Sequence, residues 1–567
     1  MDKEKARELA FKYAIKNAAL HGGKANEGAV MGKLKALFPD ALIPELITLA
    51  KNSVEKTNTL SLQEIQVQFE EFEKTGFELQ VREKEPGLPN LAWAEQEPVV
   101  TRFAPNPSGY MHLGHCRAAI TSAEFAKKYN GKFILRFDDT DPKVKKPIPK
   151  ADQAFKEDLA WLGYKPNQIV FASDRFELYY AFLRKLLEIQ KAYVCTCNNE
   201  QFKALKKKGN ACPCRNLTEK EQLERFEKML RHELKEGQAV VRIKTDLKHP
   251  DPSVRDWWAA KIVDKPEYAP AKKRVVFPSY NFASAIDDHE LGITLIIRSQ
   301  QHAQNSSKQK FLYDYFGWKY PHVMNTGIVM VKGIVLSKSE MLEKIKQKHF
   351  LGAEDPRIGT VKAFRKKGFK PSVIKEAILE IGAKPQDVIL SLEKLEDWNR
   401  QIIDPIAHRI VFLQEPVELV VKNAPAFMAK LCKHPDFPQK GFKKYALKKG
   451  TQQFWIEQKQ AVQLKKGQTV QLKQAYQVKI THSNKHRLEA EFVGTTFQKG
   501  LPIVHWLLPS EKVNVEIVMG DASTKKGVAE KILSTYKEGT PLQFEKLGFV
   551  VIEKSGKQNV KCRYTHP

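Results

Sequence analysis

The pattern of apolar and polar residues divides the chain into three regions. The first, residues 1–97, has a mostly helical pattern, is interrupted by HGGKANEGAV, and ends in a proline-rich stretch. This pattern predicts a separate helical domain followed by a linker. The second region begins at residue 98, where a strand (VVTRFA) precedes a helix (CRAAITSAEFAKKYN) and another strand (KFILRF). Strands and helices in this order predict a parallel α/β sheet.

The third region, residues 405–567, alternates apolar and polar residues between turn clusters, as in FLQEPVELVVKN, KVNVEIVMGD and LQFEKLGFVVIEK. Such alternation predicts the strands of β-barrels. The region carries 27 lysines and arginines against 13 acidic residues, a net charge of +14. A basic β-barrel module suits the binding of nucleic acid.

The whole chain is long and basic. Its 567 residues are too many for one hydrophobic core, so we expect several domains. The 94 lysines and arginines exceed the 66 acidic residues by 28, which favours a polyanionic partner, although a solvated lysine-rich surface would give the same balance. No apolar run reaches the roughly 18 residues of a membrane span, and the first twenty residues are charged throughout. We therefore expect a cytoplasmic protein with no membrane partner.

One candidate site is the stretch TRFAPNPSGYMHLGH, residues 101–115, which joins a predicted strand to a predicted helix. Parallel α/β sheets bind ligands at the carboxyl ends of their strands, which is where this stretch lies. His112 and His115 flank the first helical turn, whose unpaired N–H groups attract anions, so the two imidazoles can add donors to a phosphate. Gly114 lacks a Cβ and would let a flat ligand approach the backbone. Taken alone, the stretch could also be an ordinary turn.

A second motif is GIVLSKS, residues 333–339, a loop of small residues that offers Lys338 between Ser337 and Ser339. A lone motif of this kind is usually only a surface loop. The first motif, for its part, is not the GxGxxG of dinucleotide-binding folds, which disfavours a simple oxidoreductase.

The cysteines supply an independent signal. Two close pairs, Cys195 with Cys197 and Cys212 with Cys214, enclose 14 residues. Four thiolates in two pairs suit tetrahedral Zn²⁺, so the spacing predicts a structural zinc site. The alternatives are reduced cysteines without a metal, or disulfides in an exported protein, but no signal peptide supports export.

The two motifs together are specific, although each is weak alone. HLGH after RFAPNPSG, followed much later by VLSKS, resembles the paired motifs of class I aminoacyl-tRNA synthetases, and most strongly those of the archaeal-type glutamyl-tRNA synthetases. The resemblance covers nearly the whole chain and includes HGGKANEGAV, KFILRFDDTDPKVK, SYNFASAIDDHELGIT and EDPRIGTVKAFRKKG.

The resemblance implies a multidomain α/β architecture. It has a class I Rossmann-like catalytic domain with a zinc-bearing acceptor-stem insertion, an N-terminal helical domain and C-terminal β-barrel anticodon-binding domains. The boundaries we expect are 1–97 for the helical domain and linker, 98–192 and 279–340 for the two catalytic halves, 193–278 for the insertion, 341–404 for a helical stem-contact region, and 405–567 for the barrels.

The reaction implied by the resemblance is ATP-dependent activation of L-glutamate to an adenylate, then transfer to the terminal adenosine of tRNA(Glu), and in some relatives of tRNA(Gln). Negative charge gathers at the α-phosphate in the transition state, and His112, His115 and Lys338 are expected to stabilise it. Mg²⁺ is expected to arrive with ATP, because the sequence shows no dedicated carboxylate cage. Further ATP-binding positions are expected at Gly114, Ser337 and Ser339.

The glutamate pocket implied by the resemblance uses four residues. Arg102 would contact the amino acid, Asp138 would receive its ammonium group, and Tyr280 and Arg298 match further positions of the pocket. A planar guanidinium suits paired hydrogen bonds to a carboxylate. Each residue also has a structural alternative, since Asp138 could stabilise the DDTD turn, Tyr280 could belong to the core, and Arg298 could pair with an acid.

Two other functions stay open at this point. A glutaminyl-tRNA synthetase would share the arginine of the first turn and the RFDDT pattern, so Arg102 does not separate the two. A tRNA-binding paralogue without activation is favoured by one departure, because Ser299, Gln300 and Gln301 replace the RGKDH-like stretch usual in relatives, although His302 remains. The intact HLGH and LSKS motifs favour an active enzyme, also over a zinc-dependent RNA-binding module, which needs no ATP motifs.

Overall fold

The computed structural model describes residues 3–20, 23–38, 41–74, 88–268, 270–484 and 486–567. The chain divides into two compact units, residues 1–85 and 86–567. In the described ranges, no helix has both the length and the apolar character needed to cross a membrane. The start of the predicted proline-rich linker, residues 83–87, lies outside the described residues.

The first unit is helical where it is described, and helix α1 packs against the other three helices. Residues 23–26 of the HGGKANEGAV interruption precede α2, and its last four residues, EGAV, begin that helix. There Asn26 caps α2 by accepting a hydrogen bond from the N–H of Ala29, and the Asn58 side chain accepts from the N–H of Ala25 at 2.7 Å. The bounds are α1 Lys3–Leu20, α2 Glu27–Leu37, α3 Ile43–Asn58 and α4 Leu62–Lys74.

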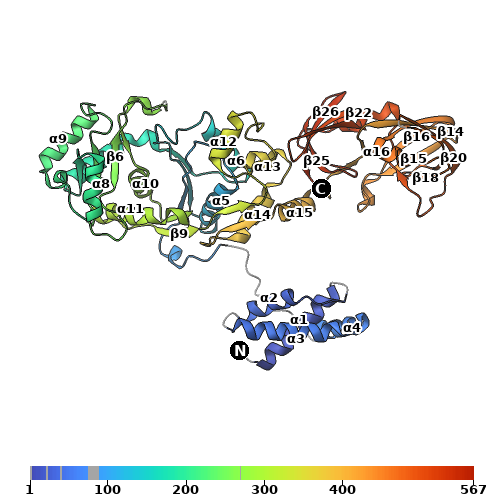
Figure 1. The fold of residues 1–567 in the computed structure, drawn as a ribbon, viewed down its shortest axis with the longest axis horizontal. Coiled ribbons are helices and arrows are strands. Elements are labelled where there is room, and N and C mark those ends of the chain that lie inside the picture. The colour runs from blue at the N-terminus through green and yellow to red at the C-terminus, as the bar shows by residue number, and fades with distance from the viewer. Residues whose placement is uncertain (1–2, 21–22, 39–40, 75–87, 269, 485) are drawn as a thin grey trace. The chain divides into compact units, whose positions relative to one another are not determined.

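The second unit is organised around a parallel sheet (Figure 1). Its strand order is β3-β2-β1-β8-β9. Thr101 of β1 pairs with Phe133 of β2 on one side and with Leu295 of β8 on the other. The sheet confirms the Rossmann-like arrangement expected from the sequence. The strands are β1 Val100–Phe103, β2 Lys132–Phe137, β3 Gln168–Phe171, β8 Leu295–Ser299 and β9 His322–Thr326.

Helix α5 (Leu113–Lys128) lies on this sheet and contacts β1, β2 and β8. Its Arg117 is 1% exposed and donates hydrogen bonds to four backbone carbonyls. These carbonyls belong to Gly327, Gly382, Lys384 and Gln386. One buried guanidinium therefore fixes α5 to two loops that are far away in the sequence.

An antiparallel sheet with the order β4-β5-β6-β7 is inserted between α7 (Phe176–Glu188) and α10 (Tyr280–Glu290). Its apolar core is continuous with α7, α10 and α11 (Ala303–Phe316), so the insertion cannot move as a separate body without breaking that core. Its elements are β4 Ala192–Cys195, α8 Asn199–Lys208, α9 Glu219–Leu230, β5 Val240–Ile243, β6 Trp258–Ile262 and β7 Val276–Pro278.

A mainly helical segment follows the parallel sheet and leads to the C-terminal sheets. It packs on the same core as α5 through Val361, Phe364 and Ile374. Within it, β10 and β11 form a short parallel pair. The elements are β10 Val329–Val331, α12 Lys338–Lys346, α13 Val361–Lys366, α14 Pro371–Ile381, β11 Val388–Leu390 and α15 Leu392–Ile403.

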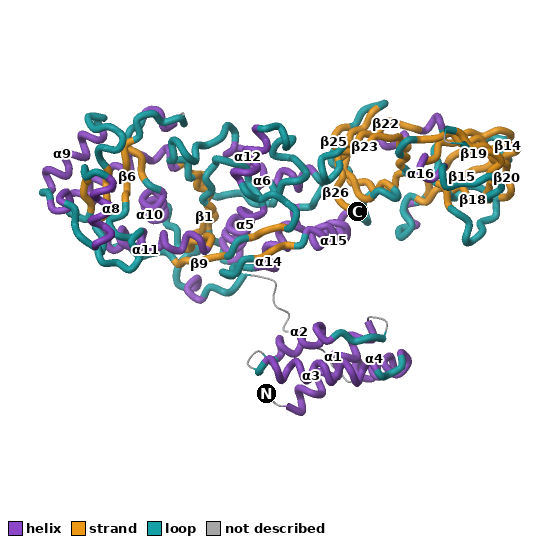
Figure 2. Tube along the Cα trace, in the orientation of Figure 1, coloured by secondary structure: helices purple, strands orange, loops and turns teal. Residues whose placement is uncertain are grey.

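Two mixed sheets with a barrel-like curl make up the C-terminal part, which confirms the strands predicted there (Figure 2). The seven-stranded sheet has the order β12-β24-β25-β26-β22-β23-β13, and the six-stranded sheet has the order β17-β14-β20-β19-β18-β21. The strands of the first are β12 His408–Ile410, β13 Phe412–Leu413, β22 Lys512–Val518, β23 Thr524–Glu530, β24 Pro541–Phe544, β25 Gly548–Lys554 and β26 Asn559–His566. Those of the second are β14 Pro416–Ala424, β17 Gly450–Glu457, β18 Thr469–Leu472, β19 Gln477–Ser483, β20 Arg487–Gly494 and β21 Ile503–Val504, beside the hairpin β15 Phe427–Cys432 and β16 Phe442–Leu447.

Candidate functional site

The two histidines of the first motif cap helix α5. Nδ1 of His112 accepts a hydrogen bond from the N–H of Gly114 at 3.1 Å, and Nδ1 of His115 accepts from the N–H of His112 at 3.4 Å. Because Nδ1 accepts in both rings, each neutral imidazole carries its proton on Nε2. Within the described chain neither Nε2 has a protein partner, so two N–H donors remain beside the helix N-terminus.

Both imidazoles are held neutral. Burial and the nearby Lys338 ammonium lower the pKa of His112 to about 4. Burial, together with the neighbouring His112 ring and the Lys338 ammonium, lowers the pKa of His115 well below its usual range. At physiological pH these side chains therefore act through N–H dipoles, and the positive charge of this site comes from Lys338.

Lys338 reaches the first motif from the second. It is the first residue of α12, and its Nζ donates to Oγ of Ser108 at 2.5 Å. Burial and the charge of Lys145 lower the pKa of Lys338. Ser337 caps α12 and its Oγ lies 3.2 Å from Oγ of Ser339, with both serines exposed. The structure thus brings the two predicted motifs together.

Two glycines make room for these side chains. A Cβ on Gly109 would lie 2.6 Å from Cδ of Lys338, and a Cβ on Gly114 would lie 2.9 Å from Cε1 of His112. Gly109 was not predicted from the sequence as a site residue, although it lies in the PSG turn of the first motif. The space left by Gly114 is next to the His112 ring. That a flat ligand approaches the backbone at Gly114 stays a prediction.

A third segment, residues 358–360, ties both motifs together and was not predicted as part of the site. Thr360 forms an isolated β-bridge with His112, and Ile358 forms one with Val335. The N–H of Leu113 donates to the carbonyl of Gly359 at 3.0 Å. The loop that carries Lys338 is therefore held beside the start of α5 by backbone pairing.

Arg102 and Asp138 lie at the carboxyl ends of β1 and β2. Arg102 is buried and binds Asp288 through Nε at 2.9 Å and Nη2 at 3.2 Å. Among the described residues its third nitrogen, Nη1, has no hydrogen-bond partner. Asp138 accepts from Nη1 of Arg136 at 3.1 Å, and its backbone carbonyl accepts from Asn106 at 2.6 Å. Asp138 thus contacts the first turn through its backbone, while its carboxylate stays 14% exposed, and its stabilisation of the DDTD turn stays a prediction.

Arg298 differs from its neighbours because it has no acidic partner within the described chain. It is 5% exposed, and Nη1 donates to Gln309 at 3.1 Å, while Nη2 donates to Ser306 and to Tyr320. Its Nε is buried without a partner. The described residues therefore give Arg298 neutral hydrogen-bond partners and no ion pair, unlike its structural alternative.

The remaining predicted positions lie at the start of α10 and on the turn after β8. Tyr280 begins α10 and is partly exposed, so it is not a core residue. The Tyr280 and His302 rings lie 6.4 Å apart between centroids. Gln300 and Gln301 of the unusual stretch are exposed on the turn after β8, whereas Oγ of Ser299 is buried without a partner.

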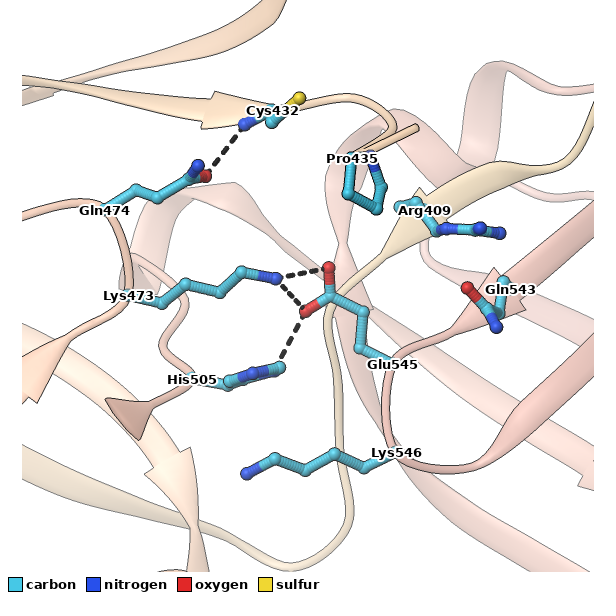
Figure 3. A pocket seen from close by; sticks show the side chains of 9 residues that line it. All are labelled: Arg409, Cys432, Pro435, Lys473, Gln474, His505, Gln543, Glu545 and Lys546. Atoms are coloured by element: carbon cyan, nitrogen blue, oxygen red, sulfur yellow. Dashed lines mark hydrogen bonds and ion pairs between the residues drawn. The ribbon is translucent and has the colours of Figure 1, made fainter. Parts of the chain in front are cut away.

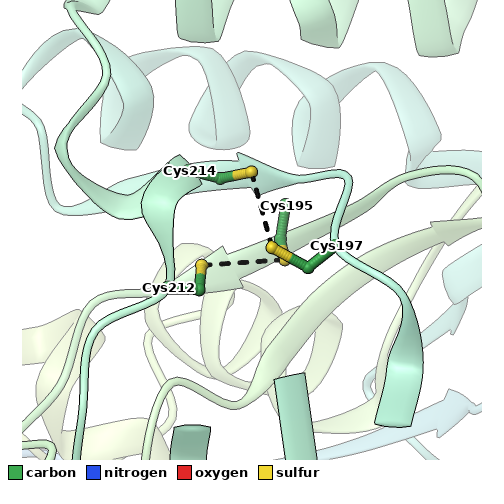
Figure 4. Close-up of side chains that lie close together, drawn as sticks. All are labelled: Cys195, Cys197, Cys212 and Cys214. Carbon is green, nitrogen blue, oxygen red and sulfur yellow. Dashed lines mark hydrogen bonds between the residues drawn. The ribbon is translucent and has the colours of Figure 1, made fainter. Parts of the chain in front are cut away.

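The four predicted cysteines lie together at the end of β4 (Figure 4). Sγ of Cys195 is 3.9 Å from Sγ of Cys212, Sγ of Cys197 is 3.8 Å from Sγ of Cys214, and all four sulfurs lie within 4.8 Å of one another. Four sulfurs on one Zn²⁺ at about 2.3 Å would be about 3.8 Å apart, so this arrangement fits the ion. Burial and neighbouring thiols raise the pKa of Cys197 to about 11, so four thiolates need a cation beside them.

A polar cavity of about 340 Å³ lies between the two C-terminal sheets and was not predicted (Figure 3). Lys473 and His505 both contact the Glu545 carboxylate, at 2.6 and 2.9 Å. Burial would raise the pKa of Glu545, but His505 and Lys473 lower it to about 2. Arg409 and Gln543 are neighbours on β12 and β24, and Nη1 of Arg409 is buried without a partner.

Comparison with known proteins shows the family of this chain. The model of tRNA synthetases class I (E and Q), catalytic domain, matches residues 98–405, and the anti-codon binding domain of the same family matches residues 407–493. The chain belongs to the class I (E and Q) tRNA synthetases. The glutamate–tRNA ligase of Pyrococcus abyssi is 45% identical over 568 residues, which cover 98% of this chain and 99% of the relative. That of Thermococcus kodakarensis is 43% identical over 573 residues, covering 99% and 100%. The family resemblance expected from the sequence is confirmed.

The capping of α5 by neutral histidines predicts a loss of stability in acid. Between about pH 6.5 and 4 the unfolded chain protonates His112 while the folded synthetase does not, so stability falls by roughly 1 kcal/mol per pH unit for this group. A His112→Asn variant keeps a capping side chain without titrating, and we expect its stability to fall less steeply. Chemical denaturation at pH 6.5 and 4.5 measures the difference. The exposed His486→Asn is the control, and an unchanged slope in His112→Asn would contradict the prediction.

Proposed function

We propose that this chain is a glutamate–tRNA ligase that activates L-glutamate with ATP and transfers it to tRNA(Glu). The convergence of His112, His115 and Lys338 at the start of α5 is the observation that carries the proposal. Family membership and the archaeal glutamate–tRNA ligases that match over full length support it. The reaction belongs in the cytoplasm, where tRNA is charged.

In the first step a carboxylate oxygen of glutamate attacks the α-phosphorus of ATP, and pyrophosphate leaves. The Nε2–H donors of His112 and His115, with the helix N-terminus, would stabilise the negative charge that gathers on the phosphate. Lys338 would add a full positive charge from the other side. Gly114, Ser337 and Ser339 would complete the ATP site, and Mg²⁺ would enter bound to ATP. In the second step a hydroxyl of the terminal adenosine attacks the glutamyl carbonyl, and AMP leaves.

The charge balance of the amino-acid pocket favours glutamate over glutamine. Arg298 has no acid among its described partners, and Arg102 keeps one nitrogen without a partner. A substrate carboxylate would supply the missing negative charge, whereas a carboxamide of the same shape would not. Asp138 would accept the ammonium group and Tyr280 would close the pocket. Charging of tRNA(Gln) by the same site is compatible with this pocket, because only the tRNA differs.

Amino-acid choice is the first test of the proposal. With tRNA present, we expect ATP–pyrophosphate exchange with glutamate and little with glutamine. A Lys338→Met variant should lose about 100-fold or more in rate, since a phosphate-stabilising charge is removed. The matched control Lys346→Met lies in the last turn of the same helix and should keep wild-type exchange. Aminoacylation of separated isoacceptors then reports whether tRNA(Gln) is charged.

The outcomes of that assay are distinct. A preference for glutamine would assign the chain to the glutaminyl branch of the family. No exchange with either amino acid, despite tRNA binding, would support a paralogue without activation, in keeping with the Ser299–Gln301 departure. Full activity in Lys338→Met would remove the proposed role of that lysine.

We propose that Cys195, Cys197, Cys212 and Cys214 hold a structural Zn²⁺ in an insertion, residues 193–278, that contacts the tRNA acceptor end. The donor set of four sulfurs and their spacing support the metal. Bound zinc would fix the end of β4 to the turn at Cys212 and Cys214. It has no role in the chemical steps.

Metal analysis tests this site. We expect about one Zn²⁺ per chain for the wild type and a large loss of zinc in Cys214→Ser, together with a lower thermal midpoint, because thiolate repulsion is then uncompensated. Cys432→Ser, outside the cluster, is the control and should keep its zinc. A metal-free wild-type protein of unchanged stability would contradict the assignment.

The cavity between the C-terminal sheets is proposed to receive a base of the tRNA anticodon, with residues 341–404 contacting the stem and 405–567 the anticodon arm. Its lining combines fixed donors, Arg409 and Gln543, with an ionised acceptor, Glu545. Such groups discriminate among the edges of unpaired bases. The net charge of +14 in residues 405–567 supports contact with the phosphate backbone.

A pairwise experiment tests this pocket. Wild-type enzyme should lose about tenfold or more in affinity for tRNA(Glu) when a recognised anticodon base is replaced. Gln543→Leu should weaken binding of the natural tRNA and no longer distinguish it from the altered tRNA at that base. Gln498→Leu, on an exposed loop, is the control and should keep the discrimination. If Gln543→Leu discriminates as strongly as the wild type at every anticodon position, the proposed role of Gln543 is contradicted.

A further inference from the structure

A buried carboxylate lies on helix α6 (Ala151–Trp161), which packs on the same core as α5 and α13. The side chain is Asp158, which is 2% exposed. In the described chain its oxygens accept no hydrogen bond, and one cation lies within ion-pair distance, Arg365, whose Nη2 is 3.7 Å from Oδ1. A buried carboxylate normally accepts hydrogen bonds, because an ionised group without them is costly inside a protein. The charge of Asp158 is therefore incompletely compensated.

The groups that act on this carboxylate belong to three helices. Burial raises the pKa of Asp158 to about 7, the charges of Arg365 and Lys362 on α13 oppose the rise, and the charge of Glu157 on α6 adds to it. On α5, burial and the charge of Asp158 raise the pKa of the Cys116 thiol, so Cys116 stays neutral. Because the pKa of Asp158 in the folded protein lies above its ordinary value of 3.8, ionising it costs the folded state free energy.

The helix that carries Arg365 is joined to the first motif at its start. Thr360, the N-cap of α13, forms the β-bridge with His112. The N–H of Val361, the first residue of α13, donates to the carbonyl of Met111 at 2.9 Å. A shift of α13 would therefore displace the backbone that lies against the His112 position.

The segment before α13 is joined in the same way to the second motif. The N–H of Gly359 donates to the carbonyl of Val335 at 2.9 Å, and the N–H of Val335 donates to the carbonyl of Arg357 at 3.2 Å. A Cβ on Gly359 would overlap Cδ2 of Leu336, two residues before Lys338. The two motifs therefore meet across one segment, and α13 continues that segment directly.

The pair of Asp158 and Arg365 does not have the geometry of an ion pair that serves stability. The atoms are 3.7 Å apart, beyond hydrogen-bond distance, and the arginine does not offset the cost of burying the carboxylate. Replacing such a buried charge by a neutral group of the same shape is often neutral or stabilising. Buried groups with perturbed pKa values are enriched at functional sites. What the carboxylate holds in place explains it better than stability does.

We propose that Asp158 is a positioning residue for adenylate formation, which acts through Arg365 on α13. Residues 358–361 transmit the position of α13 to both motifs, and so set the distance between the His112 imidazole and the Lys338 ammonium. Only the ionised carboxylate attracts Arg365, so the positioning is complete above about pH 7 and is lost below it. The proposal rests on the proposed function, because it takes activation of the amino acid by ATP as the reaction that is positioned.

Asp158→Asn in the full-length protein tests the proposal, because it keeps the shape of the side chain and removes the charge. At pH 8 we expect kcat for ATP–pyrophosphate exchange, with tRNA present, to fall about tenfold while KM for glutamate is unchanged. The rise of kcat between pH 6 and 8 should be smaller in the variant, which has no carboxylate to ionise. Its thermal midpoint should be higher than that of the wild type at pH 8, and equal to it near pH 4, where Asp158 is protonated in the folded wild type. Asp152→Asn is the control, because Asp152 pairs with Lys156 at the surface of the same helix, and it should keep the wild-type rate and pH profile.

A second comparison assigns the effect to Arg365. Arg365→Gln should slow exchange as Asp158→Asn does, and the double variant should be no slower than either one, since both changes break one connection. Hydrogen exchange of the Leu113 and Val361 amides supplies a measurement that needs no substrate. Both amides donate across the segment 359–361, and both should lose protection in Asp158→Asn.

Three outcomes overturn the proposal. Wild-type kcat in Asp158→Asn would remove its role, a lower thermal midpoint together with slower exchange would make the residue structural, and additive losses in the double variant would separate it from Arg365. A wild-type protein that exchanges with no amino acid would instead refute the proposed function. The protection of the two amides would then still show whether Asp158 holds the segment between the motifs.

Discussion

The position of β1 between β2 and β8 is the constraint on which the whole site depends. Thr101 pairs with Phe133 on one side and with Leu295 on the other, although the insertion separates β8 from β1 in the sequence. Because all three strands are parallel, their carboxyl ends meet at one edge. Arg102, Asp138 and Arg298 reach the same place for this reason alone, and so does the turn that starts α5.

Charge at this edge is arranged in two ways. Arg102 and Arg136 are buried against Asp288 and Asp287, which satisfies four charges that would otherwise be costly inside the protein. Arg298 is equally buried but has only neutral partners among the described residues. Among the described residues, this difference distinguishes Arg298 from the two arginines that form ion pairs.

Backbone pairing extends the site beyond its two motifs. Residues 358–360 pair with His112 and Val335, so the loop carrying Lys338 is placed by a segment outside either motif. The loop that precedes this stretch is connected to the C-terminal sheets, because Nη1 of Arg563 donates to the carbonyl of Glu354 at 2.5 Å. The surroundings of Lys338 are thus connected to a contact that begins in the seven-stranded C-terminal sheet.

The sequence by itself determined what is local. Alternation and helical spacing identified the three regions, and HLGH, LSKS and the cysteine spacing identified the family and the sulfur cluster, because each depends on neighbours within a few turns of chain. Only the tertiary structure decided which charges are paired. Strand order and packing decide that Arg102 has an acid while Arg298 has none among the described residues. They also decide that Gly109 makes room for Lys338 and that Asp158 lies beside Arg365. These contacts join residues far apart in sequence, and no local pattern records them.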